Sequence, residues 1–333
     1  MLKSIRFWAV SLLMIAAVES PAAEYTPDAF NAPTVAAASD EGELAIKRFR
    51  VPKGFKVELV AAEPLLANPV AFCIDHQGRF YVAETYRLHA GATDIRGHMN
   101  WLDDDLASRS VADRVAMLKK YESNRIANYT RESERLRLII DTDGNGKADK
   151  STVFSEGYNR IEDGIAAGVL ARNGSVYFSN IPDLLLLKDT DNDGVADLKD
   201  VLQTGYGVRV GFLGHDLHGL IMGPDGKLYF SVGDRGASVR QGKRAIENPE
   251  TGAVYRCNPD GSELEIVHLG LRNPQELAFD DYGNLWTGDN NSDGGDPARW
   301  VYLVEGGDSG WRIGWQFINS PNARGPWMSE RMC

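Results

Sequence analysis

The chain has 333 residues, of which 43% are hydrophobic and 25% charged, so it has the composition of a globular protein with a sizeable core. Its formal net charge of -11 and pI near 5.1 argue against nucleic acid as the main partner, because binding phosphates requires a basic surface. The 34 glycines outnumber the 14 prolines and mostly lie in turn pairs such as Asp-Gly and Asn-Gly, which indicates many short strands.

The first 23 residues have the pattern of a secretory signal peptide. Lys3 and Arg6 precede an apolar run over 7–18, and small residues follow up to Ala23. The run is short for a membrane span, although an uncleaved anchor is the alternative. We expect cleavage after Ala23 and export to the periplasm or cell surface, where the chain is soluble or peripherally attached to a membrane.

After the signal peptide, residues 24–48 are rich in Ala, Pro and Asp without periodicity, which predicts a flexible leader. The folded domain is expected to span 49–333. The chain has three cysteines, and this odd number gives no disulfide framework. Cys73 and Cys257 lie in strand patterns, where two small buried side chains are favoured over a bridge. The sequence contains no C-x-x-C-H motif for attaching a c-type haem.

A strand–turn–strand pattern recurs four times, each time with a glycine shortly before an aromatic residue. The copies cover 70–84, 164–180, 219–234 and 276–289. Two further strands are expected after each of the first three copies, at 136–141 and 152–154, at 184–188 and 201–203, and at 253–257 and 264–269. Four-stranded antiparallel units that repeat about every 40–50 residues predict an all-β protein, a β-propeller, rather than unrelated hairpins.

The fourth unit is shorter than the others, with one further strand expected at 300–304 before Gly-rich sequence. A propeller ring is often closed by an N-terminal strand, and the alternating segment 55–61 is the candidate. Three and a fraction blades are few for a ring. We therefore expect the chain to be C-terminally truncated relative to its relatives, with exposed sheet edges.

Residues 88–135 separate the second and third strands of the first unit and break the repeat. Between 107 and 125, apolar residues recur at helical spacing from Val111 to Leu118, and Ser110 is the expected N-cap. This pattern predicts a helical insertion over one face of the propeller. Such an insertion is either functional or a simple cover for the blade.

Two acidic loops place oxygen-bearing side chains at every second position. The first loop has Asp141, Asp143, Asn145 and Asp149, and the second has Asp189, Asp191, Asp193 and Asp197. A glycine follows the fifth position, where a Ca²⁺ loop turns sharply, but neither loop offers the bidentate Glu of a full EF-hand. The loops predict structural Ca²⁺ sites near the rim, with Asx-rich turns as the alternative.

His215 is the first candidate catalytic residue, because it directly precedes the expected innermost strand of the third unit, at the mouth of the channel. A neutral imidazole in that place can accept a proton. Asp216, His218 and Asp234 lie close by in the sequence. A histidine with a purely structural role is the alternative.

Arg272 occupies the equivalent position one unit later, followed by Asn273. A guanidinium beside a histidine can hold a carboxylate or stabilise an oxyanion. The alternative is an arginine that pairs with one of the many acidic residues of this chain.

The motifs GHDLHGLIMGPDGKLYFSVGD and LGLRNPQELAFDDYGNLWTGDN resemble the soluble quinoprotein glucose/sorbosone dehydrogenases. The stretches TYRLHAGATDIRGHMNWLDDDL and ERLRLIIDTDGNGKADKSTVF further resemble the N-terminal propeller of the large membrane-bound-dehydrogenase-type proteins of Planctomycetes and related bacteria. The second resemblance covers most of the chain from residue 55 onward.

These resemblances imply a six-bladed propeller that holds pyrroloquinoline quinone (PQQ) and Ca²⁺ at its axis. The catalytic histidine of the family, which abstracts the substrate hydroxyl proton, falls on His215. The cofactor-contacting Arg-Asn pair falls on Arg272 and Asn273, and we expect Asp234 at the cofactor beside them. This chain departs from the quinoprotein pattern, which has Gly and Arg where His218 and Gly219 stand here.

The expected function is therefore an exported dehydrogenase domain that oxidises a sugar or alcohol hydroxyl. His215 would be the general base, Arg272 would polarise an oxygen of the cofactor or substrate, and electrons would pass to a c-type cytochrome. The alternative is a non-catalytic, calcium-stabilised propeller that binds glycans or proteins at the cell surface. Binding of PQQ distinguishes the two.

Overall fold

The structure, a computed structural model, describes residues 29–293 and 296–317. The expected signal peptide and the third cysteine lie outside these residues, so export stays a prediction. Within the described ranges, no helix is both long and apolar enough to cross a membrane. Cys73 and Cys257 are free thiols, with Cys257 buried and Cys73 half-buried.

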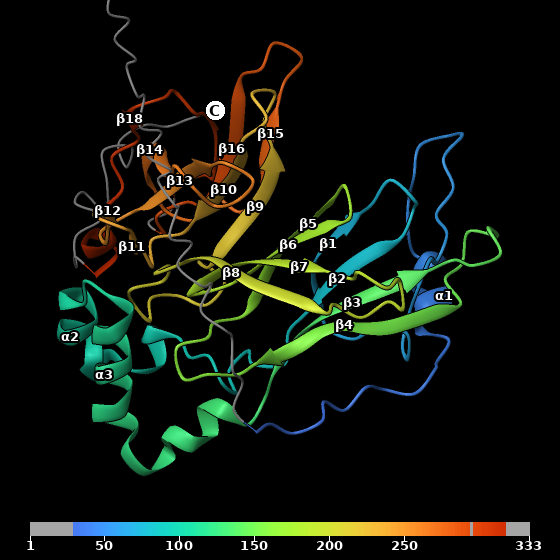
Figure 1. Cartoon of the computed structure of the whole chain (residues 1–333), viewed down its shortest axis with the longest axis horizontal. Coiled ribbons are helices and arrows are strands. Elements are labelled where there is room, and N and C mark those ends of the chain that lie inside the picture. Colours follow the sequence, from blue (N-terminus) through green and yellow to red (C-terminus); the bar gives the residue numbers. More distant parts are fainter. Residues whose placement is uncertain (1–28, 294–295, 318–333) are drawn as a thin grey trace, which may run out of the picture.

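Four small antiparallel sheets form the body of the molecule and are arranged as the blades of a β-propeller (Figure 1). The first blade has β1 (Pro69–Ile74), β2 (Phe80–Glu84), β3 (Glu134–Ile140) and β4 (Lys150–Tyr158). The second has β5 (Ala166–Arg172), β6 (Ser175–Asn180), β7 (Asp183–Lys188) and β8 (Leu198–Thr204). The third has β9 (Leu217–Met222), β10 (Leu228–Val232), β13 (Gly252–Cys257) and β14 (Glu265–Leu271). The fourth has β15 (Leu277–Phe279), β16 (Leu285–Asp289) and β17 (Arg299–Tyr302). The predicted all-β propeller is confirmed, with four blades described.

The apolar residues that alternate along the strands fill the interfaces between neighbouring blades. Tyr81, Leu138 and Phe154 of the first blade pack against Phe178 and Leu185 of the second. Equivalent clusters lie between the second and third blades and between the third and fourth. The first strands of successive blades, β1, β5, β9 and β15, contact one another, so they are the innermost strands.

The two outermost blade faces expose apolar side chains that have no neighbouring blade in the described structure. On the first blade these include Phe72 and Ile74, and on the fourth Trp300 and Tyr302. Each alternates with a residue that points into an interface, as the period of two of a strand requires.

The expected strand at 55–61 does not form. This segment lies across the outer face of the first blade, where Val60 and Ala61 line a groove together with Phe72 and Phe80. Its backbone contact with the blade is one hydrogen bond, from Ala148 N to Val60 O, because the segment faces the side chains of the sheet rather than an edge with free donors and acceptors. Upstream, a short helix α1 (Glu41–Ile46) lies within the range expected to be a flexible leader.

Two further parts of the chain were not expected. A hairpin of β11 (Ala237–Gln241) and β12 (Arg244–Asn248) separates β10 from β13. After the fourth blade, the chain returns to the third, where β18 (Gly307–Asp308) pairs in parallel with β14.

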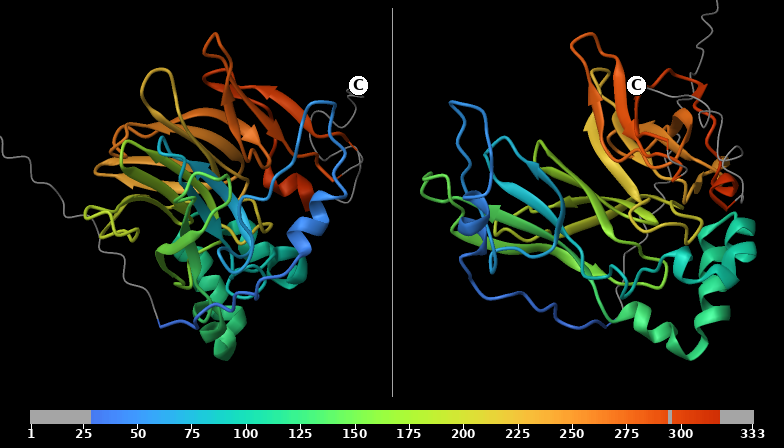
Figure 2. Two further views of the ribbon diagram at one scale, coloured as in Figure 1. Left: turned by 90° about the vertical axis from the view of Figure 1, so that its right-hand side faces the viewer. Right: turned by 180° about the vertical axis from the view of Figure 1, so that it is seen from behind.

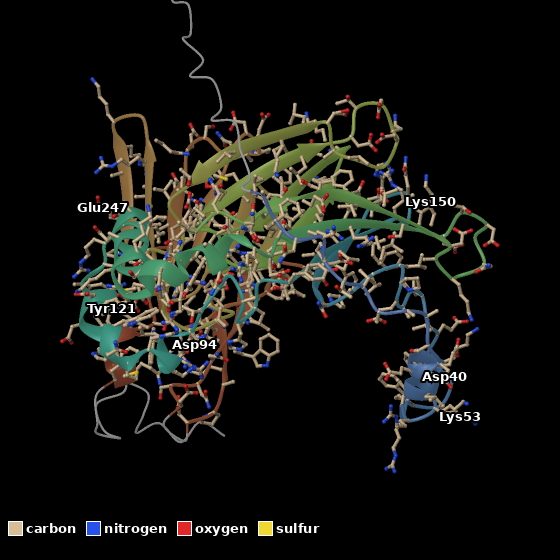
Figure 3. The ribbon with its side chains drawn as sticks, turned by 90° about the horizontal axis from the view of Figure 1, so that it is seen from below. Asp40, Lys53, Asp94, Tyr121, Lys150 and Glu247 are labelled. Carbon is tan, nitrogen blue, oxygen red and sulfur yellow. The ribbon has the colours of Figure 1, made fainter. Side chains whose placement is uncertain are left out.

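The predicted insertion is helical, with α2 (Leu102–Ala107), α3 (Val111–Glu122) and the 3-10 segments η1 (Ile95–Gly97), η2 (Met99–Trp101) and η3 (Ser123–Thr130). Ser110 caps α3 by accepting a hydrogen bond from the Asp113 amide, as expected. The helices gather at one side of the sheets (Figure 2). Asp94 and Tyr121 of the insertion lie at the opposite end of the molecule from Lys150 (Figure 3).

Candidate active site

A buried acid or amide stands at the end of the second strand in each blade, or two residues after it in the third. These residues are Glu84, Asn180, Asp234 and Asp289, all at most 2% exposed. Because second strands run in the same direction in every blade, all four lie on one face of the propeller. The helical insertion begins after the end of β2, and His215 lies just before the start of β9; both of these strand ends are on that same face. The candidate active site is therefore on this face.

His215 and Asp234 form a buried hydrogen-bonded pair at this face. The His215 Nδ1 and Asp234 Oδ1 atoms are 2.7 Å apart. They approach because Gly233 has no side chain: a Cβ there would lie 2.8 Å from the His215 Cβ. A carboxylate at Nδ1 favours the tautomer with its proton on Nδ1, so the lone pair is on Nε2. Nε2 has no hydrogen-bond partner among the described residues, which leaves it available as a proton acceptor.

Trp311 completes this pair and was missed in the sequence. Its indole Nε1 donates to Asp234 Oδ2 over 2.9 Å, and the side chain is fully buried. Trp311 reaches Asp234 because the chain after β18 folds back along the third blade, where its amide donates to Gly270 O. One carboxylate oxygen of Asp234 thus contacts His215 and the other accepts from Trp311. With both oxygens held in this way, Asp234 can orient the imidazole ring of His215.

Phe212 forms an apolar wall beside His215, with 5.5 Å between the two ring centroids. The guanidinium carbon of Arg96 lies 4.3 Å from the Phe212 centroid and that of Arg272 lies 5.5 Å from it. These are distances at which a cation is attracted to an aromatic face. Arg272 and His215 thus both lie beside the Phe212 ring.

The guanidinium of Arg272 is held by the protein on all three nitrogens. It donates to Asp293 Oδ2 over 2.7 Å, to Asn291 O over 2.7 Å and to Gln316 Oε1 over 3.1 Å. The side chain is also buried. Arg272 therefore pairs with an acidic residue, which was the alternative to a role in binding a carboxylate or oxyanion. Its contacts anchor the wall of the site.

Asn273, in contrast, has a side-chain oxygen without a partner among the described residues. Its Oδ1 is buried and accepts no hydrogen bond in the described part of the chain. Its backbone amide donates to Asp289 Oδ1 over 2.8 Å, which fixes the residue. A buried polar atom without a partner carries a free-energy cost unless water or a ligand satisfies it.

Asn273 lies in an open pocket of about 320 Å³. The pocket is lined by Asn273, Gln275, Gly288, Asp289, Asn290, Ala298, Arg299 and Trp300. Gln275 connects it to the His215 loop, since its Nε2 donates to Gly214 O over 3.3 Å. Burial raises the pKa of Asp289, although this carboxylate accepts the amides of Arg272 and Asn273 and pairs with Arg299.

The other two candidates near His215 have structural partners. Asp216 forms a buried ion pair with Arg235, at 2.6 Å. The ring nitrogens of His218 face Ala167 O at 3.1 Å and Gly214 O at 2.9 Å, and burial lowers its pKa. His218 therefore joins the second blade to the loop before His215 and does not face the pocket.

The acidic loops lie away from this face, between β3 and β4 and between β7 and β8. In the second loop, one oxygen from each of Asp189, Asp191 and Asp197 lies within 4.8 Å of the others. Asp193 is not in this group, and its Oδ1 accepts the amide of Val195.

The first loop brings no such group together in the described residues. Asp141 accepts the amides of Gly144, Asn145 and Gly146, which lower the pKa of its carboxyl. Asp149 is bound by Thr142, whose hydroxyl and amide lower the pKa of that carboxyl. Asp143 in turn accepts hydrogen bonds from Asn145.

The fold and this face define a β-propeller protein with a His–Asp pair at the mouth of the blades. The model of the family described as "Domain of unknown function (DUF7133)" matches residues 41–305. This range covers most of the chain, which therefore belongs to that family.

One curated relative supports the relation to quinoprotein dehydrogenases that the sequence motifs indicated. Quinoprotein glucose dehydrogenase B of Acinetobacter calcoaceticus is 30% identical over 124 residues, which cover 29% of this chain and 26% of the relative. The chain thus matches about a quarter of the length of that enzyme.

Solved structures with a similar arrangement include two sugar dehydrogenases. The PQQ-bound aldose sugar dehydrogenase of Streptomyces coelicolor has a TM-score of 0.45 and 17% identity, over 74% of this chain and 63% of that one. The PQQ domain of pyranose dehydrogenase from Coprinopsis cinerea has a TM-score of 0.43 and 15% identity, over 76% of this chain and 51% of that one.

Proposed function

We propose that this chain is a quinoprotein-like dehydrogenase domain that oxidises a hydroxyl group of a sugar, with His215 as the general base. The observation that carries the proposal is the buried His215–Asp234 pair, which leaves Nε2 without a described partner at the face that holds the pocket. The stretch related to a quinoprotein glucose dehydrogenase supports the same chemistry.

The pocket fits PQQ, which is a flat molecule with several carboxylates. Its volume of about 320 Å³ lies within the range of small-molecule sites. Arg299 brings a guanidinium that is paired with Asp289, the largely exposed Trp300 offers an aromatic face, and the amide of Asn273 has a buried oxygen without a partner among the described residues. When bound, PQQ would supply the two-electron acceptor for alcohol oxidation.

The residues of this chain would prepare the substrate hydroxyl. His215 Nε2 accepts its proton, and Asp234 stabilises the imidazolium that forms because its carboxylate lies 2.7 Å from Nδ1. Trp311 keeps Asp234 in place, and Phe212 limits the access of water to one side of the ring. Arg272 anchors the wall beside Phe212, with its charge paired to Asp293.

Replacing Asn273 by Ala should weaken PQQ binding while changing stability little. The Oδ1 atom has no partner to lose, so we expect the free energy of unfolding to change by less than about 1 kcal/mol, whereas PQQ affinity falls roughly tenfold. Fluorescence titration with PQQ and urea denaturation measure the two quantities. Asn258→Ala, in the turn between β13 and β14, is the matched control and should bind PQQ normally. Equal PQQ affinity in Asn273→Ala and the wild type would contradict this assignment.

We also propose that the loop with Asp189, Asp191 and Asp197 binds Ca²⁺. One carboxylate oxygen from each of the three lies close to the others, and the spacing of the acids resembles that of a Ca²⁺ loop. EDTA should lower the melting temperature of the calcium-loaded protein by roughly 3 °C or more, because an ion bound to the folded state stabilises it. Asp189→Asn should remove this response. An identical melting temperature with and without EDTA would show that the loop is an Asx-rich turn.

The decisive experiment adds PQQ and CaCl₂ to the purified protein and follows the quinone absorbance when sugars are added. The proposal predicts tight binding and reduction of the quinone by at least one aldose. Failure to bind PQQ would favour the non-catalytic propeller. A c-type cytochrome as the final acceptor stays a prediction from the sequence resemblance.

A further inference from the structure

The loop 207–214 delivers His215 to the site, and it is irregular rather than part of a sheet. Two consecutive amides of this loop, from Val210 and Gly211, donate to the two carboxylate oxygens of Asp105 over 2.7 Å and 3.2 Å. Asp105 lies in α2 of the helical insertion, more than 100 residues earlier, and is 1% exposed.

The insertion contacts this loop at both ends as well. Near the start of the loop, Arg114 Nε donates to Gly207 O over 2.7 Å. Near its end, the Leu213 amide donates to Asp94 Oδ2 over 3.2 Å. Between them, the amide of Ile95 donates to Gly211 O over 2.9 Å.

The apolar side chains of the loop are also buried by the insertion. Val210 and Phe212 belong to one cluster with Ile95, Trp101 and Met117 of the insertion. Phe212 in turn packs against the His215 ring. The helices therefore contact the loop through its backbone and its side chains, immediately before the residue that carries the proposed chemistry.

We propose that Asp105 of the helical insertion is a positioning residue, which fixes the loop 207–214 and through it His215. This inference rests on the proposed function of His215.

Asp105 is well suited to positioning because its carboxylate is costly to bury. Burial raises its pKa, and the two amides of the loop together with Arg209 and Arg235 act in the opposite direction. A buried carboxylate is favourable only while those amides remain in place, so Asp105 and the loop hold each other in a single arrangement. An irregular loop without such contacts would be free to move.

The test compares Asp105→Asn with Asp113→Asn. Asn retains one acceptor oxygen in place of two. Asp113, at the start of α3, accepts hydrogen bonds from the Arg109 amide and the Ser110 hydroxyl and none from the loop 207–214. In Asp105→Asn we expect amide exchange at 210 and 211 to accelerate roughly tenfold. We expect diethyl pyrocarbonate to modify His215 several-fold faster, because this side chain is largely shielded while the loop is held. Turnover should fall by ~10²-fold with PQQ affinity unchanged, because a small displacement of a catalytic group is costly.

In Asp113→Asn, the rate of His215 modification and turnover should match the wild type. The proposal is overturned if Asp105→Asn also keeps wild-type values for both while only its melting temperature falls. If the wild type oxidises no sugar, the proposed function fails, and the rate of His215 modification still decides whether Asp105 positions the loop. If Asp105→Asn does not fold, Asp94→Ala replaces it, since it removes the acceptor of the Leu213 amide.

Discussion

Replacing His215 by Ala should lower the turnover of sugar by about 10²–10⁴-fold, the usual contribution of a general base. The protein loses the atom proposed to accept the hydroxyl proton, and Asp234, the buried partner of His215, keeps the hydrogen bond from Trp311. PQQ affinity should stay within about threefold of the wild type, because the pocket is lined by residues of the fourth blade and its approach. Steady-state kinetics with PQQ-loaded protein and a titration of PQQ measure the two effects.

Two further variants distinguish a catalytic from a structural effect of His215. Asp234→Asn keeps the shape of the pair but allows the other imidazole tautomer, so turnover should fall strongly with little loss of PQQ affinity. His76→Ala removes an exposed histidine in the turn between β1 and β2, on the opposite face, and should behave as the wild type. If His215→Ala retains turnover within a few-fold of the wild type, His215 is not the base.

The blades could be predicted from the sequence because their signals are local. Alternating apolar residues and a glycine turn before an aromatic strand place β9 and β10, for example, without any knowledge of distant contacts. The same kind of signal failed at 55–61. That segment alternates like a strand, but it lies on the side chains of the first blade and pairs with no strand edge in the described structure.

The site was only half predictable, because its supporting contacts join residues far apart in sequence. His215 and Arg272 were found from their places before and after blade strands. Trp311 could not be found, since it stands in Gly-rich sequence and its partner Asp234 lies 77 residues earlier. One further signal is present in the sequence: a carboxylate or amide ends or closely follows the second strand in all four copies of the repeat, and this pattern places Asp234 and Asp289 on the same face as His215.

Arg87 makes the contacts that join the insertion to the first two blades. It follows β2 and is fully buried, and its five guanidinium N–H groups lie within hydrogen-bond distance of six backbone carbonyls, so at least one N–H is shared. Three belong to the insertion and its exit (Gly91, Tyr129 and Glu132), and three belong to the entry into the second blade (Arg160, Asp163 and Gly164). A Cβ at residue 91 would lie 2.7 Å from the guanidinium, so this packing requires Gly91.

Replacing Arg87 by Met should therefore lower the free energy of unfolding by about 3–5 kcal/mol, because a similar volume is kept while buried carbonyls lose their donors. Arg87→Lys should fall between Met and the wild type, since an ammonium has three donors and lacks the planar fork of the guanidinium. Urea denaturation monitored by tryptophan fluorescence measures these changes.

Arg172→Met is the matched control, because this arginine is exposed at the end of β5, and it should change stability by less than about 0.5 kcal/mol. A loss below about 1 kcal/mol in Arg87→Met would show that water satisfies the six carbonyls as well as the guanidinium does.

Because Arg87 holds both ends of the insertion, its loss should also release the loop before His215. The amides of Val210 and Gly211, whose acceptor Asp105 lies in α2 of the insertion, should then exchange faster in Arg87→Met, although the substituted side chain touches neither.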